Sequence, residues 1–145
     1  MANEVPYAFP VELLSGTHNF ASDTFKLALY TSTPYTTGST IYVVTDETTG
    51  TEYSAGGNTL TGNAVSNVAN YATVDFTDSV WGSPTPATFS AAFGAIYNSS
   101  ATNKLIVVLD FGGTKSCSNG TFTVTFPSPT SGSPTGADAL LSIQS

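Results

Sequence analysis

Hydrophobic and polar residues alternate along much of the chain with a period of two, the spacing of a β-strand that buries one face. In residues 24–32, for example, Phe25 and Leu27 fall on one face and Lys26 falls on the other. Clusters of turn residues separate such segments at intervals typical of antiparallel β-sandwiches. The pattern predicts seven or eight short strands, at residues 24–32, 40–46, 59–61, 71–78, 89–97, 104–111, 121–126 and 137–144.

Three places in this pattern carry more specific information. Residues 104–111 (KLIVVLDF) are almost continuously apolar, which predicts a central strand covered on both faces. Residues 89–97 place Ala and Gly among aromatic residues, which indicates a close neighbour across the sheet. The pair Asn119-Gly120 lies between two predicted strands and is typical of a hairpin corner.

The N-terminal segment follows a different pattern. Residues 1–10 (MANEVPYAFP) lack a clear period and indicate an arm that packs on the body or on a neighbour. Residues 10–16 permit about one helical turn, with Pro early and Gly at its end. A length of 145 residues suits one domain, and no βαβ spacing is present. We therefore predict an arm at 1–10 and one all-β domain at 11–145, an antiparallel β-sandwich with jelly-roll-like topology.

Basic side chains are scarce. The chain has three Lys and no Arg against ten acidic residues, and its net charge is −7. Because phosphate binding depends on Lys and Arg, we expect no nucleic-acid partner, and anionic membrane surfaces are disfavoured for the same reason. No stretch approaches the ~20 apolar residues of a membrane helix. No export signal is recognised, so we expect synthesis in a cytoplasm without secretion.

Few residues could carry catalysis. His18 is the only histidine, and without a G-x-S-x-G elbow it is most simply a loop residue with local hydrogen bonds. Asp75 and Asp78 could form a calcium site or a glycosidase pair, but their spacing on a strand points them to opposite faces. The single Cys117 excludes an intrachain disulfide and a multi-cysteine metal site. We therefore predict no enzyme, no cofactor and no metal site.

Aromatic residues offer the better candidates for binding. Large aromatic side chains anchor protein interfaces, and a loop tryptophan can also stack on a sugar. Core packing is the simpler interpretation of Trp81, with the other two left open. The candidate interface residues are Tyr7, Phe9, Tyr35 and Trp81.

Four segments of the chain carry a resemblance to a known family. They are LLSGTHNFASDTFKLALY (13–30), ATVDFTDSVW (72–81), FGAIYNSSATNKLIVVLDFG (93–112) and GTFTVTFP (120–127). In this order they resemble small virion structural proteins of tailed bacteriophages. Members of that family are described as capsid decoration, cement, neck or tail components. No catalytic residues come with the resemblance.

The resemblance implies a virion structural protein, made in the host cytoplasm and placed on the capsid exterior. Our leading hypothesis is a capsid cement or decoration protein that stabilises the lattice of the major capsid protein. Its partners would be that protein and copies of itself, as a dimer or trimer. The arm at 1–10 and the loops around Tyr35, Trp81 and 127–136 are the expected contacts. The alternatives are a tail, neck or fibre-associated component and, third, a carbohydrate-binding module.

Overall fold

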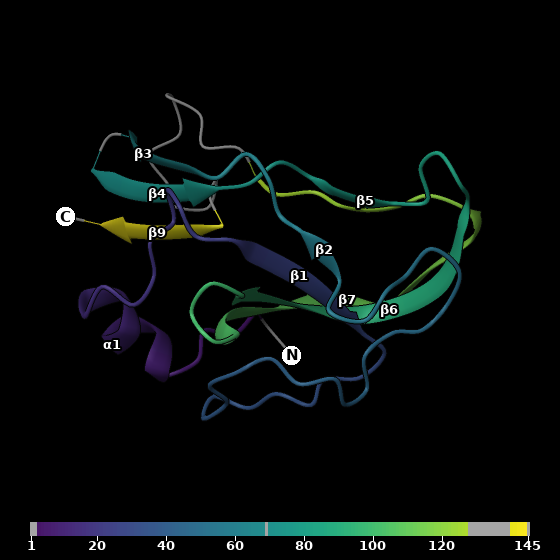
Figure 1. Cartoon of the computed structure of the whole chain (residues 1–145), viewed down its shortest axis with the longest axis horizontal. Helices are drawn as coiled ribbons and strands as arrows, with labels where there is room; N and C mark the ends of the chain where they lie inside the picture. Colours follow the sequence, from purple (N-terminus) through teal and green to yellow (C-terminus); the bar gives the residue numbers. More distant parts are fainter. Residues whose placement is uncertain (1–2, 69, 128–139, 145) are drawn as a thin grey trace.

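The computed structural model describes residues 3–68, 70–127 and 140–144, which form two packed layers of antiparallel strands and one short helix (Figure 1). The elements are α1 (Ala8–Leu14), β1 (Phe25–Tyr30), β2 (Asn58–Thr59), β3 (Ala64–Val68), β4 (Tyr71–Asp75), β5 (Ser79–Trp81), β6 (Ala87–Asn98), β7 (Lys104–Gly120), β8 (Phe122–Val124) and β9 (Leu141–Gln144). One layer is a four-stranded sheet in the order β2-β1-β6-β7. The other holds the sheet β3-β4-β9 and the pair β5-β8. The predicted all-β antiparallel sandwich is confirmed, whereas this strand order does not confirm jelly-roll topology.

The four-stranded sheet is covered on both faces, and its strand β1 has buried apolar residues on each face. Phe25, Leu27 and Leu29 face the space between the layers and are fully buried. On the opposite face Ala28 and Tyr30 are also fully buried, and they belong to a second, separate apolar cluster. The alternation predicts that only one face of this strand is buried, but the structure buries both faces.

The cover over that second face includes residues 40–46, which do not form the predicted strand. Ile41 makes an isolated bridge to Lys104, and Tyr42 stacks on Tyr97 with ring centroids 4.6 Å apart. The Tyr35 hydroxyl accepts a hydrogen bond from the backbone N–H of Val43 at 3.1 Å. Packing by Tyr42 and Val43, with two backbone hydrogen bonds to residues 103 and 105, thus replaces a strand ladder. The β-branched residues Ile41 and Val44 are 46% and 64% exposed.

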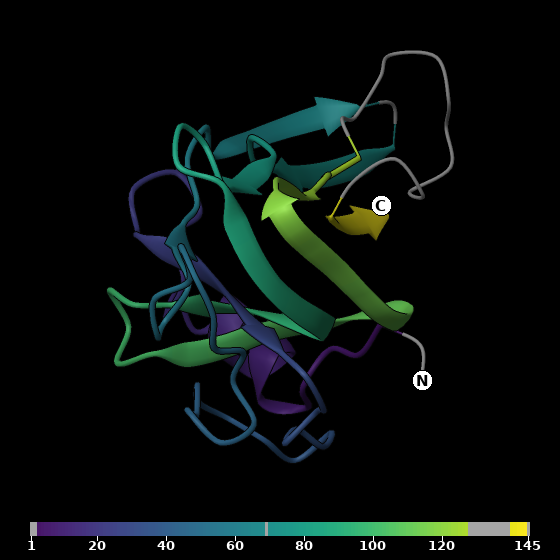
Figure 2. The same ribbon diagram turned by 90° about the vertical axis from the view of Figure 1, so that its right-hand side faces the viewer.

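Strands β6 and β7 form a long hairpin that bends from one layer toward the other (Figure 2). Three register shifts interrupt their ladder, and such bulges bend and twist a strand pair. Gly94 lies where the hairpin passes β1: a Cβ there would be 3.1 Å from Leu27 Cδ1 and from Phe111 Cζ. The close neighbour predicted for residues 89–97 is confirmed.

Strand β7 ends the four-stranded sheet, so the predicted central position is wrong. Its first half is nevertheless buried on both faces, because Ile106 belongs to the cluster between the layers and Leu105 to the cluster on the opposite face. A chain segment, and no named strand, covers its outer edge. Glu4 bridges Val108 with two backbone hydrogen bonds of 2.8 Å. The predicted hairpin at Asn119-Gly120 is also wrong, because β8 pairs with β5 and the chain crosses between layers there.

The N-terminal segment forms a helix that begins earlier than expected. Helix α1 starts at Ala8, so the predicted boundary between arm and domain at residues 10 and 11 falls inside it. Phe9 is buried under the sheet, with its ring 6.3 Å from that of Phe20. The helix is therefore part of the packed body.

Candidate binding cleft

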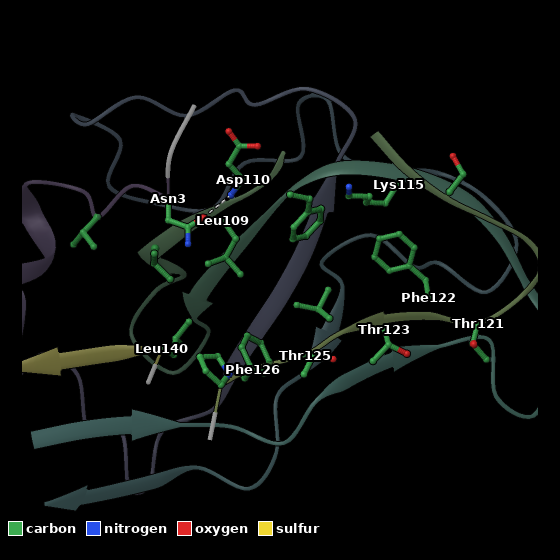
Figure 3. Close-up of a pocket in the computed structure, with 16 residues that line it drawn as sticks. Asn3, Leu109, Asp110, Lys115, Thr121, Phe122, Thr123, Thr125, Phe126 and Leu140 are labelled. Carbon is green, nitrogen blue, oxygen red and sulfur yellow. Dashed lines mark hydrogen bonds between the residues drawn. The ribbon is translucent and has the colours of Figure 1, made fainter. Parts of the chain in front are cut away.

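An apolar cleft opens between β7 and β8, which belong to different sheets and do not pair with each other (Figure 3). Its volume is about 740 Å³. The apolar side chains that line it are Val5, Val107, Leu109, Phe111, Phe122, Val124, Phe126 and Leu140.

Strict alternation along residues 121–126 builds one wall of the cleft. Phe122 and Phe126 are 7% and 4% exposed and belong to the main core, whereas Thr121, Thr123 and Thr125 are exposed. Figure 3 shows the aromatic rings directed into the cleft from this strand. The cleft thus lies against the main core, beside a strand whose outward side chains are threonines.

Most side chains along the strand edges at this cleft are uncharged. Strand β8 pairs only with β5 among the described residues, so its second edge carries no ladder there. At the rim, Asn3 Oδ1 accepts a hydrogen bond from the Asp110 N–H at 2.9 Å, and Lys115 lies farther along β7. Natural edge strands are usually blocked by charged residues, covering segments or strong twist. This arrangement is suited to receiving an extended apolar segment.

His18 lies away from this cleft, in a buried polar network. Asn98 Oδ1 accepts hydrogen bonds from the N–H groups of Ser100 and Ala101, which fixes its amide so that Nδ2 is directed at His18 Nδ1, 3.1 Å away. His18 Nδ1 is therefore the acceptor, and Nε2 carries the proton and donates to Glu12 Oε2 at 3.2 Å. The imidazole is held between two structural partners.

The same network joins four parts of the chain. Glu12 of α1 also pairs with Lys104 at the start of β7, at 2.8 Å. Asn98 Nδ2 donates to Asp23 Oδ2 at 2.7 Å, and the Asn19 N–H donates to the same oxygen at 2.9 Å. The Asn19 and Asn98 hydrogen bonds lower the pKa of Asp23 below its ordinary value. The network anchors α1 on the sheet.

A second polar cluster surrounds Glu47. Its carboxylate accepts hydrogen bonds from the Tyr42 hydroxyl at 2.6 Å, the Tyr53 hydroxyl at 2.7 Å and the Gly56 N–H at 2.7 Å. Burial raises the pKa of Tyr42 and Tyr53, and the neighbouring carboxylate raises both further. These hydroxyls are therefore neutral donors that hold the cover over the sheet.

The carboxylates considered for metal binding or hydrolysis do not converge. Asp78 Oδ1 accepts a hydrogen bond from the Phe126 N–H at 2.9 Å, while Asp75 Oδ1 is buried without a partner among the described residues. Within residues 3–68, 70–127 and 140–144, no three His, Cys, Asp or Glu side chains are grouped as metal ligands. Cys117 is buried, with its Sγ 3.7 Å from the Phe89 carbonyl oxygen.

Of the four predicted interface residues, only Tyr7 has an exposed side chain, with 74% of its surface accessible. Phe9, Tyr35 and Trp81 are 4%, 5% and 3% exposed, and all three pack in the chain's own core. For these three the interface prediction is not supported, because their rings are already covered. Core packing, the simpler interpretation of Trp81, is confirmed. Of the loop at 127–136, all but Pro127 lies outside the described residues.

Sequence reasoning did not identify the cleft. Phe111 and Phe126 lie in the predicted strands 104–111 and 121–126, and nothing in the sequence indicates that these two strands do not pair with each other. The one available signal is the run TFTVTF, whose outward positions are all threonine and carry no charge. Such a strand edge lacks the usual protection against pairing.

Comparison with known proteins adds no relative. No protein-family model matches the chain, and neither a curated protein nor a solved structure is significantly similar to it. Among the described residues, no helix has the length and apolar character needed to cross a membrane.

Proposed function

We propose that this chain is a structural protein of a tailed-phage virion that binds neighbouring capsid subunits as cement. The observation that carries the proposal is the apolar cleft between β7 and β8, whose lining includes the partly buried side chains of Leu109 and Phe111 beside an uncharged strand edge. A concave, mostly apolar site of this kind is the usual form of a binding site. The two polar clusters, around His18 and Glu47, hold elements of the fold together, which supports a binding role over catalysis.

The geometry favours addition of a strand as the mode of binding. An extended segment of a capsid subunit pairs with the free edge of β8, and its backbone hydrogen bonds supply affinity. Every second side chain of that segment enters the cleft and contacts Phe111 and Phe126. Specificity then depends on the size of those side chains, because the opposite ones face solvent.

Copy number in the particle tests this role against that of a tail or neck component. Trypsin releases residues 105–115 as one peptide, because Lys104 and Lys115 flank it. An isotope-labelled copy of this peptide, added to digested virions of the encoding phage, gives an absolute count by mass spectrometry. A ratio near one chain per one or few major capsid subunits supports cement. A few copies per particle would place the protein in the tail or neck, and none would end the virion proposal.

The binding mode is tested separately with a charged residue at the strand edge. Thr123→Lys places a cation on β8, and we expect at least about tenfold weaker binding to capsids. Thr114→Lys adds the same charge on an exposed part of β7 that does not line the cleft, so its binding should match the wild type. Equal binding by both variants would contradict strand addition at β8.

A further inference from the structure

Helix α1 carries more apolar surface than its own fold covers. Phe9 and Leu13 face the body, while Tyr7, Val11 and Leu14 are 74%, 68% and 90% exposed. At about 100° per residue, these positions make a continuous apolar arc that spans more than half of the helix circumference. A helix that packs against the protein on a single side needs an apolar arc of about 100°. We call the exposed residues Tyr7, Val11 and Leu14 the helix ridge.

A second apolar surface adjoins the ridge. A groove of about 710 Å³ runs between α1 and the sheet β3-β4-β9, which lie at the same end of the molecule in Figure 1. Ladder partners place Val65, Val74 and Leu141 side by side on one face of this sheet, and Ala72 and Ile143 next to them. Val65 and Ile143 are 57% and 59% exposed. We call this surface the sheet groove.

Among the described residues, no charged side chain lines the sheet groove, and Glu12, the one acid of α1, is directed away from the ridge. Glu12 is paired with Lys104 and His18 on the side of the helix that contacts β7. This is notable because each copy of the chain has a net charge of −7. Two copies can approach closely only through uncharged surfaces, since like charges repel across an interface.

The apolar lining of the sheet groove calls for an apolar occupant. The stretch 128–139 (SPTSGSPTGADA) is the longest part outside the described residues, and its sequence contains no large apolar side chain. An occupant must instead present a compact apolar projection. The helix ridge of another copy is such a projection.

We infer that two copies of this chain form a two-fold dimer in which the helix ridge of each inserts into the sheet groove of the other. A ridge and a groove side by side on one surface are self-complementary under a two-fold axis, so both contacts form at once. The exposed ridge and groove side chains together present several hundred Å² per copy, the scale of the ~800 Å² per partner in a standard interface. This inference goes beyond the proposed function, since it concerns the purified chain and needs no virion.

Sedimentation equilibrium on the purified full chain tests the dimer. We expect a mass twice the 14.9 kDa of the chain, and tighter association at higher salt because screening weakens the repulsion between the two acidic copies. Leu14→Asp in the ridge and Ile143→Lys in the groove should each raise the dimer dissociation constant at least about 100-fold. Val44→Asp is the matched control, because Val44 is 64% exposed but lies outside both surfaces, and its dimer should be unchanged.

Mixing the two variants distinguishes mutual insertion from other dimers. A heterodimer of Leu14→Asp with Ile143→Lys has one native contact and one contact between opposite charges, so the mixture should regain dimers that neither variant forms alone. Far-UV circular dichroism and thermal unfolding of each variant verify that it is folded. A monomeric wild type, a trimer, a dimer that survives both substitutions, or a mixture that stays monomeric would each overturn the inference. None of these results depends on binding to capsids, so failure here leaves the proposed function to its own test.

Discussion

Glu47 shows how much a single side chain organises in this fold. It lies outside the strands, yet three hydrogen bonds from Tyr42, Tyr53 and Gly56 end on its carboxylate. The Tyr53 hydroxyl also accepts a hydrogen bond from the backbone N–H of Leu29 at 2.8 Å, which connects the loop to β1. Hydrogen bonds to a charged acceptor contribute more to stability than bonds between neutral groups. Glu47 therefore contributes strongly to stability although it is only half-buried.

Glu47→Gln removes the charge but keeps the shape of the side chain. We expect a loss of about 1.5–3 kcal/mol in the free energy of unfolding, because charged acceptors strengthen hydrogen bonds and one amide group cannot accept from all three donors. Urea unfolding followed by tryptophan fluorescence measures it. Glu52→Gln, at an exposed position, should change stability by less than about 0.5 kcal/mol. Equal effects of the two variants would show that Glu47 has no special role.

The tyrosines around Glu47 predict a distinct alkaline behaviour. Burial raises the pKa of Tyr97 to about 12 and also raises the pKa of Tyr30, Tyr35, Tyr42 and Tyr53. A pKa raised in the folded state gives stability that is fully present below the ordinary value of 10.0 and is lost as pH rises through the folded pKa. Ultraviolet titration should therefore show these tyrosines ionising together with unfolding. Reversible ionisation of all seven near pH 10, with intact circular dichroism, would contradict the buried cluster.

At the scale of elements, the loop before β2 passes very close to the backbone of β1. Gly57 precedes β2, which pairs with β1, and has a φ of 68°. A Cβ on Gly57 would overlap the carbonyl oxygen of Leu27, a backbone atom of β1 that cannot move without disturbing the ladder. Gly112 in β7 has a similar φ of 70° but no atom within 4 Å of such a Cβ. The two glycines therefore separate steric overlap from backbone strain.

Gly57→Ala and Gly112→Ala make a matched pair. Both introduce a side chain at positive φ, which costs about 1 kcal/mol. Gly57→Ala adds the overlap with Leu27, and we expect a total loss of about 3 kcal/mol. Chemical unfolding of the two variants measures the difference. Similar losses for both would mean that the loop and β1 do not approach as closely as the structure describes.

At the scale of the whole molecule, the network around Asn98 joins parts distant in sequence. Asn98 is fully buried at the end of β6, and through it the loop at Asp23, His18 and the helix residue Glu12 are connected. The network also holds α1 in the position that defines the sheet groove. Its integrity therefore determines both stability and the proposed dimer surface.

The carboxylate of Asp23 makes this network sensitive to acid. Its pKa is lowered, so its contribution to stability is present above the ordinary value of 3.8 and is lost as pH falls through the lower folded value. Asp23→Asn should lower the melting temperature by a few degrees at neutral pH, and the difference from wild type should shrink at acidic pH. Asp46→Asn, at an exposed position, is the control and should follow the wild type. A difference that is constant with pH would rule out a role for the ionised carboxylate.

The sequence by itself determined the class of fold and most of the strands. Period-two alternation predicts strands at β1, β4 and β8, and the near-absence of long helical patterns favours an all-β fold. In β8 it also predicts the buried face, whereas β1 is buried on both faces and β4 buries Thr73. The scarcity of Lys and Arg likewise follows directly from the amino-acid composition. These properties are local or additive along the chain, so no three-dimensional knowledge is needed.

Only the tertiary structure decided which surfaces are covered. Residues 40–46 cover the sheet through Tyr42 and Val43 and form no strand. Strand β7 lies at the edge of its sheet, where isolated bridges to distant segments take the place of a ladder. Phe9, Tyr35 and Trp81 are also buried. The cleft and the sheet groove arise between elements far apart in sequence, and alternation specifies which face of a strand is apolar but not what lies against it.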